Sequence, residues 1–282
     1  MKYKLPRRRT RLIRTGNELR KRYRLRKPIP RTVVPSFFTL MNLFSGFVAI
    51  VQIHEGRLEY GAWLIIAAGL FDALDGFMAR LANATSDFGV ELDSLSDVVS
   101  FGVAPGFLLY QYSFQDLHEP GIMLAALPAL CGAVRLARFN VEAGLEKGIY
   151  FKGLPIPAMA AMIVGVYLTF GPREDLYSDL IVNVESVLIP MVVLLSFLMV
   201  STVQFDKIPR FNAVYIKENP WKTALFVVYG MAILIFREFG LMAVFSFFIG
   251  KGLLLMIYRF IAYLRYGDSW VESNYNGGTS GQ

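Results

Sequence analysis

The chain has 282 residues, of which 55% are hydrophobic and 14% aromatic, and its mean hydropathy is +0.45. A soluble domain of this length cannot bury so much apolar surface, so the composition excludes an ordinary soluble protein and predicts an integral membrane protein. The net charge of +7 is concentrated at one end, because residues 1–31 contain fourteen Lys or Arg and a single acid, Glu18.

The basic segment, residues 1–32, lies immediately before the first apolar run. Lys and Arg in this position hold the end of the chain in the cytoplasm and attract anionic lipid headgroups, by about 1 kcal/mol for each nearby cation. A nucleic-acid-binding arm is the alternative, but the neighbouring span explains the charge, so we expect membrane lipids and no nucleic acid as partners. The segment is too long for a cleaved signal peptide and is predicted to remain as a cytoplasmic arm.

Apolar runs of roughly 20 residues, enough to cross about 30 Å of hydrocarbon, recur along the rest of the chain. They predict an all-α integral membrane protein with a bundle of about eight transmembrane helices. The expected spans are residues 33–53, 61–82, 88–113, 121–141, 154–171, 184–203, 221–236 and 239–264. The boundary between the last two lies near Arg237 and Glu238, and six spans plus a re-entrant hairpin remain an alternative. Residues 267–282 are rich in Gly and Ser and are predicted to form a flexible tail.

The positive-inside rule sets the orientation of these spans. With the basic arm in the cytoplasm, eight spans bring the C-terminus back to the same side. The loops agree, because those assigned outside are mainly acidic and those assigned inside carry Lys and Arg. We therefore predict a multi-pass protein of the cytoplasmic membrane with both termini in the cytoplasm.

Two aspartates interrupt the second predicted span, which reads GLFDALDGFMARLA. Each charge inside a span costs about 2.5 to 3.5 kcal/mol on the membrane-insertion scale, so Asp72 and Asp75 need compensating partners. At about 100° per residue they share one helical face with Gly76 and Ala79, and Arg80 lies at its margin. Small residues on that face would let a flat base or a diphosphate group approach the helix backbone.

The third predicted span begins DFGVELDSLSDVVSFG, and its aspartates, Asp93 and Asp97, are four apart and share a face. A short cytoplasmic turn at residues 83–87 makes the second and third spans antiparallel neighbours. Asp72 lies about ten residues before this turn and Asp97 about ten after it, so both lie at a depth of about 15 Å. Four carboxylate groups are therefore predicted to line a polar cavity that opens to the cytoplasm.

Four carboxylate groups repel one another unless protons or bound cations neutralise them. An all-oxygen ligand set favours Mg²⁺, Mn²⁺ or Ca²⁺, and two divalent ions would leave positions for phosphate oxygens, as in-line phosphoryl transfer requires. Two alternatives remain open. The carboxylates could pair with Arg80, Arg135 or Arg138 in a purely structural role, or they could relay cations in a cation-coupled transporter, which would not need small residues beside them.

One spacing in these two spans resembles the complete signature of the CDP-alcohol phosphatidyltransferase family: Asp72-x2-Asp75-Gly76-x2-Ala79-Arg80-x8-Gly89-x3-Asp93-x3-Asp97. The resemblance extends over a predicted six-helix core, residues 33–203, and leaves residues 204–266 as additional C-terminal transmembrane helices. It implies an enzyme that transfers the phosphatidyl group of CDP-diacylglycerol to an alcohol and releases CMP.

The resemblance also implies roles for individual residues. The ligands of two divalent ions, Mg²⁺ or Mn²⁺, would be Asp72, Asp75, Asp93 and Asp97. Asp97 would also be the catalytic base that takes the proton from the attacking hydroxyl group. The CDP part of the substrate would contact Gly76, Ala79, Arg80 and Gly89. The stretch PSFFTLMNLFSG resembles the nucleotide contact of the family's first helix and adds Thr39 and Asn42.

Two further stretches, RLARFNVEAG at 135–144 and FKGLPIPAMAAM at 151–162, resemble the branch of the family that uses L-serine as acceptor. An amino-acid acceptor needs a cation for its carboxylate group, and Arg binds carboxylates bidentately. The expected acceptor-binding residues are Arg135, Arg138, Asn140 and Lys152. Glycerol 3-phosphate or inositol phosphate as acceptor is the alternative within the family, and a homodimer is a further expectation from the resemblance.

Overall fold

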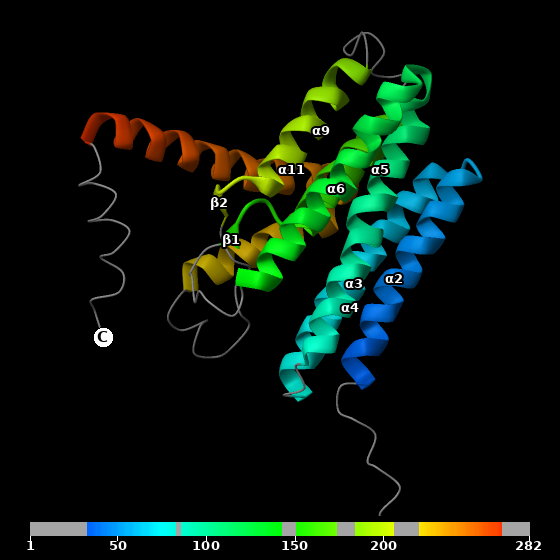
Figure 1. Cartoon of the computed structure of the whole chain (residues 1–282), viewed down its shortest axis with the longest axis horizontal. Helices are drawn as coiled ribbons and strands as arrows, with labels where there is room; N and C mark the ends of the chain where they lie inside the picture. Colours follow the sequence, from blue (N-terminus) through cyan, green and yellow to red (C-terminus); the bar gives the residue numbers. More distant parts are fainter. Residues whose placement is uncertain (1–32, 83–85, 143–150, 174–183, 206–219, 267–282) are drawn as a thin grey trace, which may run out of the picture.

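The computed structural model describes residues 33–82, 86–142, 151–173, 184–205 and 220–266. The predicted basic arm, 1–32, and the predicted tail, 267–282, lie outside the described residues. Within the described ranges, long helices lie side by side around a shared apolar core that includes Phe101, Ile163 and Met199 (Figure 1). The helical architecture agrees with that of an integral membrane protein.

Helices α2 (Val33–His54) and α3 (Leu58–Ala82) form an antiparallel hairpin. Gly56, with a φ of 80°, lies in the turn, in a backbone conformation that favours glycine. The helices approach closely beside this turn, because a Cβ atom at Gly61 would lie only 3.0 Å from the Ala49 carbonyl oxygen. The hairpin therefore brings the middle of α3 beside α2.

A continuous helical rod runs from Asp87 to Leu117, but it is not a uniform α-helix. Its parts are α4 (Asp87–Asp97), the π-helix η1 (Val98–Val103), α5 (Ala104–Leu109), the π-helix η2 (Tyr110–Phe114) and the 3₁₀ turn η3 (Gln115–Leu117). The sequence predicted a single regular helix here and missed the π-helical turns. Pro105 is one physical reason for the irregularity, because it lacks the N–H group that an α-helical turn would use.

The remaining elements lie beside the rod or against one another (Figure 1). They are α6 (Glu119–Glu142), β1 (Phe151–Lys152), α7 (Ile156–Phe170), the 3₁₀ turn η4 (Gly171–Arg173), α9 (Val184–Val200), β2 (Gln204–Phe205) and α11 (Pro220–Tyr266). β1 and β2 form a two-residue antiparallel ladder, which the sequence analysis did not predict. The ladder ties the segment before α7 to the segment after α9.

Five helical stretches among the described residues are long and apolar enough to cross a membrane. They are Ser36–His54, Leu58–Leu81, Asp87–Leu117, Glu119–Glu142 and Thr223–Arg265. α7 and α9 are apolar but contain only 15 and 17 residues. α11 is interrupted at Arg237, where φ is 50° and ψ is −120°, so the predicted boundary near Arg237 and Glu238 is confirmed. The count of eight spans stays a prediction.

Two glycines allow the rod to approach α6 closely. A Cβ atom at Gly102 would lie 2.9 Å from the Ala129 Cα atom, and one at Gly106 would collide with the Ala125 carbonyl oxygen. Small residues at such contacts are typical of helices packed inside membranes, where van der Waals contact between backbones replaces the hydrophobic effect. The packing of α5 on α6 therefore depends on the absence of a side chain at Gly106.

We expect Gly106→Ala to destabilise the protein, because the added methyl group must push α5 away from α6. Overpacking of this kind costs roughly 1 to 3 kcal/mol, so the thermal unfolding midpoint of the detergent-solubilised protein, followed by circular dichroism, should fall. Gly230→Ala on α11 is the matched control, since a Cβ atom there meets nothing within 4 Å. Equal midpoints for the two variants would contradict the close packing.

Candidate metal centre

Three carboxylate groups meet between α3 and α4. Asp72 and Asp75 lie one turn apart on α3, and Asp93 reaches them from α4. Each offers one oxygen atom, and these three oxygen atoms all lie within 4.8 Å of one another. Asp75 is 7% exposed and the other two side chains are half-buried. The structure thus brings together three of the four aspartates that the sequence singled out, and we call them the carboxylate cluster.

Asp97 lies one turn further along α4, beside the carboxylate cluster. Its side chain is 7% exposed and accepts a hydrogen bond from Asn42 Nδ2 at 3.2 Å. The charges of Asp72 and Asp93 act on its carboxyl group. Its oxygen atoms are not among the three that lie within 4.8 Å of one another. The fourth aspartate is therefore held next to the cluster by α2 rather than within it.

Several buried polar atoms at this site have no hydrogen-bond partner among the described residues: Asp75 Oδ2, Asp93 Oδ1 and Asn42 Oδ1. Buried oxygens without a partner are costly, because they lose water and gain nothing in return. Cations are the natural partners of adjacent anionic groups, and carboxylate oxygens are the ligands that hard divalent cations prefer. The residues present therefore fit a divalent-metal site.

Two buried serines that the sequence analysis did not single out hold α4 and η1 against α2. Ser96 Oγ lies 2.9 Å from the Leu92 carbonyl oxygen of its own helix and 3.3 Å from the Thr39 carbonyl oxygen, so its one proton is shared between them. Ser100 Oγ donates to the Asn42 carbonyl oxygen at 3.0 Å. These bonds set the register of the two helices, so that the Thr39 hydroxyl group interacts with Asp75. The sequence signal was available, because hydroxyl groups four residues apart in an apolar span are typical of contacts between membrane helices.

The remaining residues predicted to contact CDP lie on α3 and α4, the two helices that carry the carboxylate cluster. Arg80 is exposed near the end of α3 and its charge acts on the cluster, while Ala79 beside it is half-buried. A Cβ atom at Gly76 would lie 3.6 Å from Arg80 Nη1, in ordinary contact. Gly89 also has a local role, since its N–H group donates to Ser86 Oγ at 3.1 Å and this serine caps α4.

Arg135 is the predicted acceptor residue whose charge interacts with an aspartate of the site. It is 7% exposed on α6, its charge interacts with that of Asp97, and its Nε atom has no hydrogen-bond partner in the described parts of the chain. Arg138, one turn further along α6, donates instead to two backbone carbonyl oxygens at the end of α9. Asn140 Nδ2 donates to a serine hydroxyl group of α4 at 3.0 Å, and Lys152 is part of β1.

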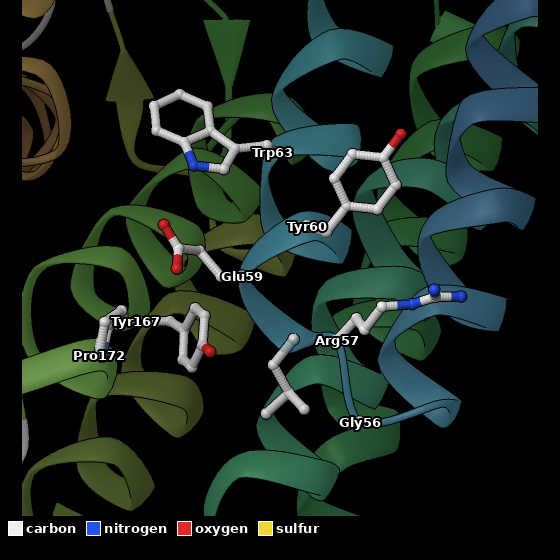
Figure 2. Close-up of a pocket in the computed structure, with 8 residues that line it drawn as sticks. Gly56, Arg57, Glu59, Tyr60, Trp63, Tyr167 and Pro172 are labelled. Carbon is white, nitrogen blue, oxygen red and sulfur yellow. The ribbon is translucent and has the colours of Figure 1, made fainter.

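A pocket of about 530 Å³ lies at the other end of α3 (Figure 2). Figure 2 shows the Glu59 carboxylate group between the side chains of Trp63 and Tyr167. Glu59 precedes Asp72 by 13 residues on the same helix, which corresponds to about 20 Å. This pocket is therefore separate from the carboxylate cluster, and the predicted polar cavity beside the aspartates stays a prediction.

Comparisons with known proteins bear on this site. The model of the CDP-alcohol phosphatidyltransferase family matches residues 32–198, which include all four aspartates. The chain is 36% identical over 199 residues to a Helicobacter pylori protein named CDP-diacylglycerol–serine O-phosphatidyltransferase, covering 71% of this chain and 79% of that protein. A Bacillus subtilis protein of the same name is 34% identical over 190 residues, covering 67% and 98% of the two chains. Archaetidylserine synthase of Methanothermobacter thermautotrophicus is 37% identical over 182 residues, covering 64% and 72%.

We expect Asp93→Asn to weaken Mn²⁺ binding, because the variant removes the one carboxylate that α4 contributes to the cluster. Loss of a group that only supports a metal ligand costs about 10- to 100-fold in affinity, so loss of a ligand should cost at least about tenfold. A titration followed by the electron paramagnetic resonance signal of free Mn²⁺ measures this. Asp116→Asn, which alters an exposed carboxylate in η3, is the control. Unchanged Mn²⁺ affinity in Asp93→Asn would rule out the carboxylate cluster as the metal site.

Proposed function

Because the chain belongs to the CDP-alcohol phosphatidyltransferase family, we propose that it transfers the phosphatidyl group of CDP-diacylglycerol to the hydroxyl group of L-serine and releases CMP. Bacterial relatives that align with two thirds or more of the chain are named for this reaction. The observation that carries the proposal is the carboxylate cluster with the Arg135 guanidinium group near it. This arrangement combines a place for divalent cations with a cation for an amino-acid carboxylate.

The carboxylate cluster, together with Asp97, would hold two divalent ions, Mg²⁺ or Mn²⁺. When bound, these ions neutralise the diphosphate of CDP-diacylglycerol and make CMP a better leaving group. The chain's own contribution is to hold carboxylate oxygens close together from two helices, with Asp75 Oδ2 and Asp93 Oδ1 open to a ligand. Such a set of hard oxygen ligands accepts either ion.

The CDP part of the substrate lies over the face of α3 that carries the aspartates. Because Gly76 and Ala79 have small side chains or none, a base or a diphosphate can approach the helix backbone on this face. The exposed Arg80 guanidinium group pairs with the diphosphate. Gly89 leaves the same space open at the start of α4. Thr39 and Asn42 approach the nucleotide from α2, where the serine hydrogen bonds hold them in register.

Asp97 acts as the base for the attacking hydroxyl group. The serine oxygen forms a bond to the phosphorus of the phosphatidyl group, the bond from that phosphorus to the CMP oxygen breaks, and the hydroxyl proton passes to Asp97. A carboxylate beside cations is a weak base, so the proton leaves during the attack rather than before it. The hydrogen bond from Asn42 Nδ2 keeps the Asp97 carboxylate in one orientation for this transfer.

Arg135 binds the carboxylate group of L-serine. Its guanidinium group is buried near Asp97 and has a donor, Nε, available for a ligand, and a guanidinium group matches a carboxylate with two parallel hydrogen bonds. Asn140 and Lys152, at the neighbouring ends of α6 and β1, are the further candidates for acceptor contacts. By the positive-inside rule this side of the bundle faces the cytoplasm, and the homodimer stays a prediction.

The reaction is tested by CMP release from the detergent-solubilised protein given CDP-diacylglycerol, Mn²⁺ and L-serine. We expect serine-dependent release, and Asp97→Asn should reduce kcat by about 10²- to 10⁴-fold, the usual contribution of a general base. Asp116→Asn should retain wild-type activity. Release with glycerol 3-phosphate alone would refute serine as the acceptor, and no release with any acceptor would favour the cation-coupled transporter.

We expect Arg135→Gln to raise the KM for L-serine by at least about tenfold, because hydrogen bonds to a charged group contribute about 1.5 to 3 kcal/mol. The KM for CDP-diacylglycerol should change much less. Steady-state kinetics with each substrate varied in turn measures both constants, and Arg57→Gln, at the other end of the bundle, is the control. An equal rise in both KM values would place Arg135 at the CDP diphosphate instead.

A further inference from the structure

The C-terminal end of α9 is held by a side chain from another helix. Arg138 Nη1 on α6 donates to the Val200 carbonyl oxygen at 2.8 Å, and Arg138 Nη2 donates to the Ser201 carbonyl oxygen at 3.2 Å. The last carbonyl groups of any helix lack partners within the helix, and a cation there also interacts favourably with the helix dipole. Arg138 therefore caps α9, although the two helices are far apart in the sequence.

Gly153 completes this contact from a third segment. Its φ is +80°, and a Cβ atom would collide with the Met199 carbonyl oxygen and lie 3.2 Å from Arg138 Nη2. Its N–H group donates to the Val203 carbonyl oxygen, just after α9, at 2.7 Å, and the next N–H group, that of Leu154, donates to the Leu198 carbonyl oxygen of α9 at 3.0 Å. Only glycine fits both the space and the backbone conformation at this position.

We call Arg138, Gly153 and the end of α9 the Arg138 junction. The ladder between β1 and β2 continues it, because Lys152 pairs with Gln204 immediately next to Gly153. The Ile156 side chain at the start of α7 lies against Gly132 on α6, so these two segments also pack through an apolar contact. The junction thus fixes α6, the segment that leads into α7 and the end of α9 relative to one another.

The Arg138 junction lies directly next to the acceptor side of the site. Arg135 is one turn from Arg138 on α6, so the two side chains project from nearly the same face of that helix. Arg135 is buried, and its charge interacts with that of Asp97. Lys152 precedes Gly153 in the chain. Arg135 and Lys152, two of the predicted acceptor-binding residues, are therefore attached to backbone that the junction holds.

We propose that Arg138 is a positioning residue for the acceptor: by joining α6 to the end of α9 around Gly153, it sets where Arg135 lies relative to Asp97 and thereby the affinity for L-serine. Its guanidinium group is engaged with two backbone carbonyl groups, so it does not supply the bidentate contact to the serine carboxylate. This inference rests on the proposed function and divides the two neighbouring arginines into a binding residue and a positioning residue.

Two variants test the junction from its two sides. Arg138→Gln removes the charged cap, and Gly153→Ala pushes the same contact apart without altering any group that could bind serine. We expect each variant to raise the KM for L-serine by about tenfold or more, because small displacements of a binding group are costly, with little change in the KM for CDP-diacylglycerol. Arg138→Lys keeps the charge but not the two-pronged contact and should have an intermediate KM. Arg57→Gln and Gly230→Ala are the matched controls.

Three outcomes would overturn the proposal. A rise in the serine KM for Arg138→Gln with a normal value for Gly153→Ala would mean that Arg138 contacts serine itself. A fall in kcat with unchanged KM values in both variants would mean that the junction only supports folding. If wild-type protein releases no CMP with L-serine, the proposed function fails and this inference with it, whereas wild-type activity with normal variants refutes the inference alone.

A second measurement covers the case in which Gly153→Ala does not fold. L-serinamide lacks the carboxylate group, so the ratio of its inhibition constant to the KM for L-serine reports carboxylate recognition. If Arg138 only positions Arg135, Arg138→Gln should raise the KM for L-serine more than the inhibition constant of L-serinamide, and it should lower this ratio less than Arg135→Gln does, because the Arg135 guanidinium group is still present. If the ratio falls to about one in Arg138→Gln, so that the enzyme no longer distinguishes L-serine from L-serinamide, Arg138 is itself the carboxylate ligand and its positioning role is refuted.

Discussion

Carboxylate groups inside an apolar helical bundle need positive or hydrogen-bonding partners, and this requirement organises the structure around α3 and α4. Two neighbouring helices contribute a polar group to them. α2 contributes the Asn42 amide group, which donates to Asp97, and α6 contributes the Arg135 guanidinium group. The charges of Arg135 and of the exposed Arg80 cannot balance four aspartates. The surrounding protein therefore orients the carboxylates, and neutralisation is left to ligands that the site binds.

The polar contacts between α2 and the rod explain how this orientation is maintained. Ser96 and Ser100 donate to backbone carbonyl oxygens of α2 rather than to side chains. Such bonds fix the height of one helix relative to the other without using any group that a substrate could contact. A shift of α2 by one turn would move Asn42 away from Asp97 by about 5.4 Å. The placement of the Asp97 carboxylate beside Asn42 thus depends in part on two hydroxyl groups outside the family signature.

The sequence was sufficient to predict the helical bundle and the faces of its aspartates, because both follow from local periodicity. Asp72 and Asp75 share a face in any regular helix. Because α4 begins only a few residues after α3 ends, Asp93 is expected to lie beside them. The break at Arg237 was also predictable from charged residues between two apolar runs. The partner of Arg138 was not, since the Val200 carbonyl group lies 62 residues away and backbone acceptors leave no compositional signal. The ladder of β1 and β2 is too short to show alternation.

The π-helical segment Val98–Val103 divides the rod into two parts with different neighbours. Before it, α4 packs against α2 and carries Asp93 and Asp97. After it, α5 packs closely against α6 at Gly106. A π-turn contains one residue more than an α-turn, so it rotates the faces of the following half of the rod relative to those of the preceding half. Deleting one residue from this stretch would allow an α-turn here, which would keep Asp93 and Asp97 on their present face and leave the contact of Gly106 with α6 in place.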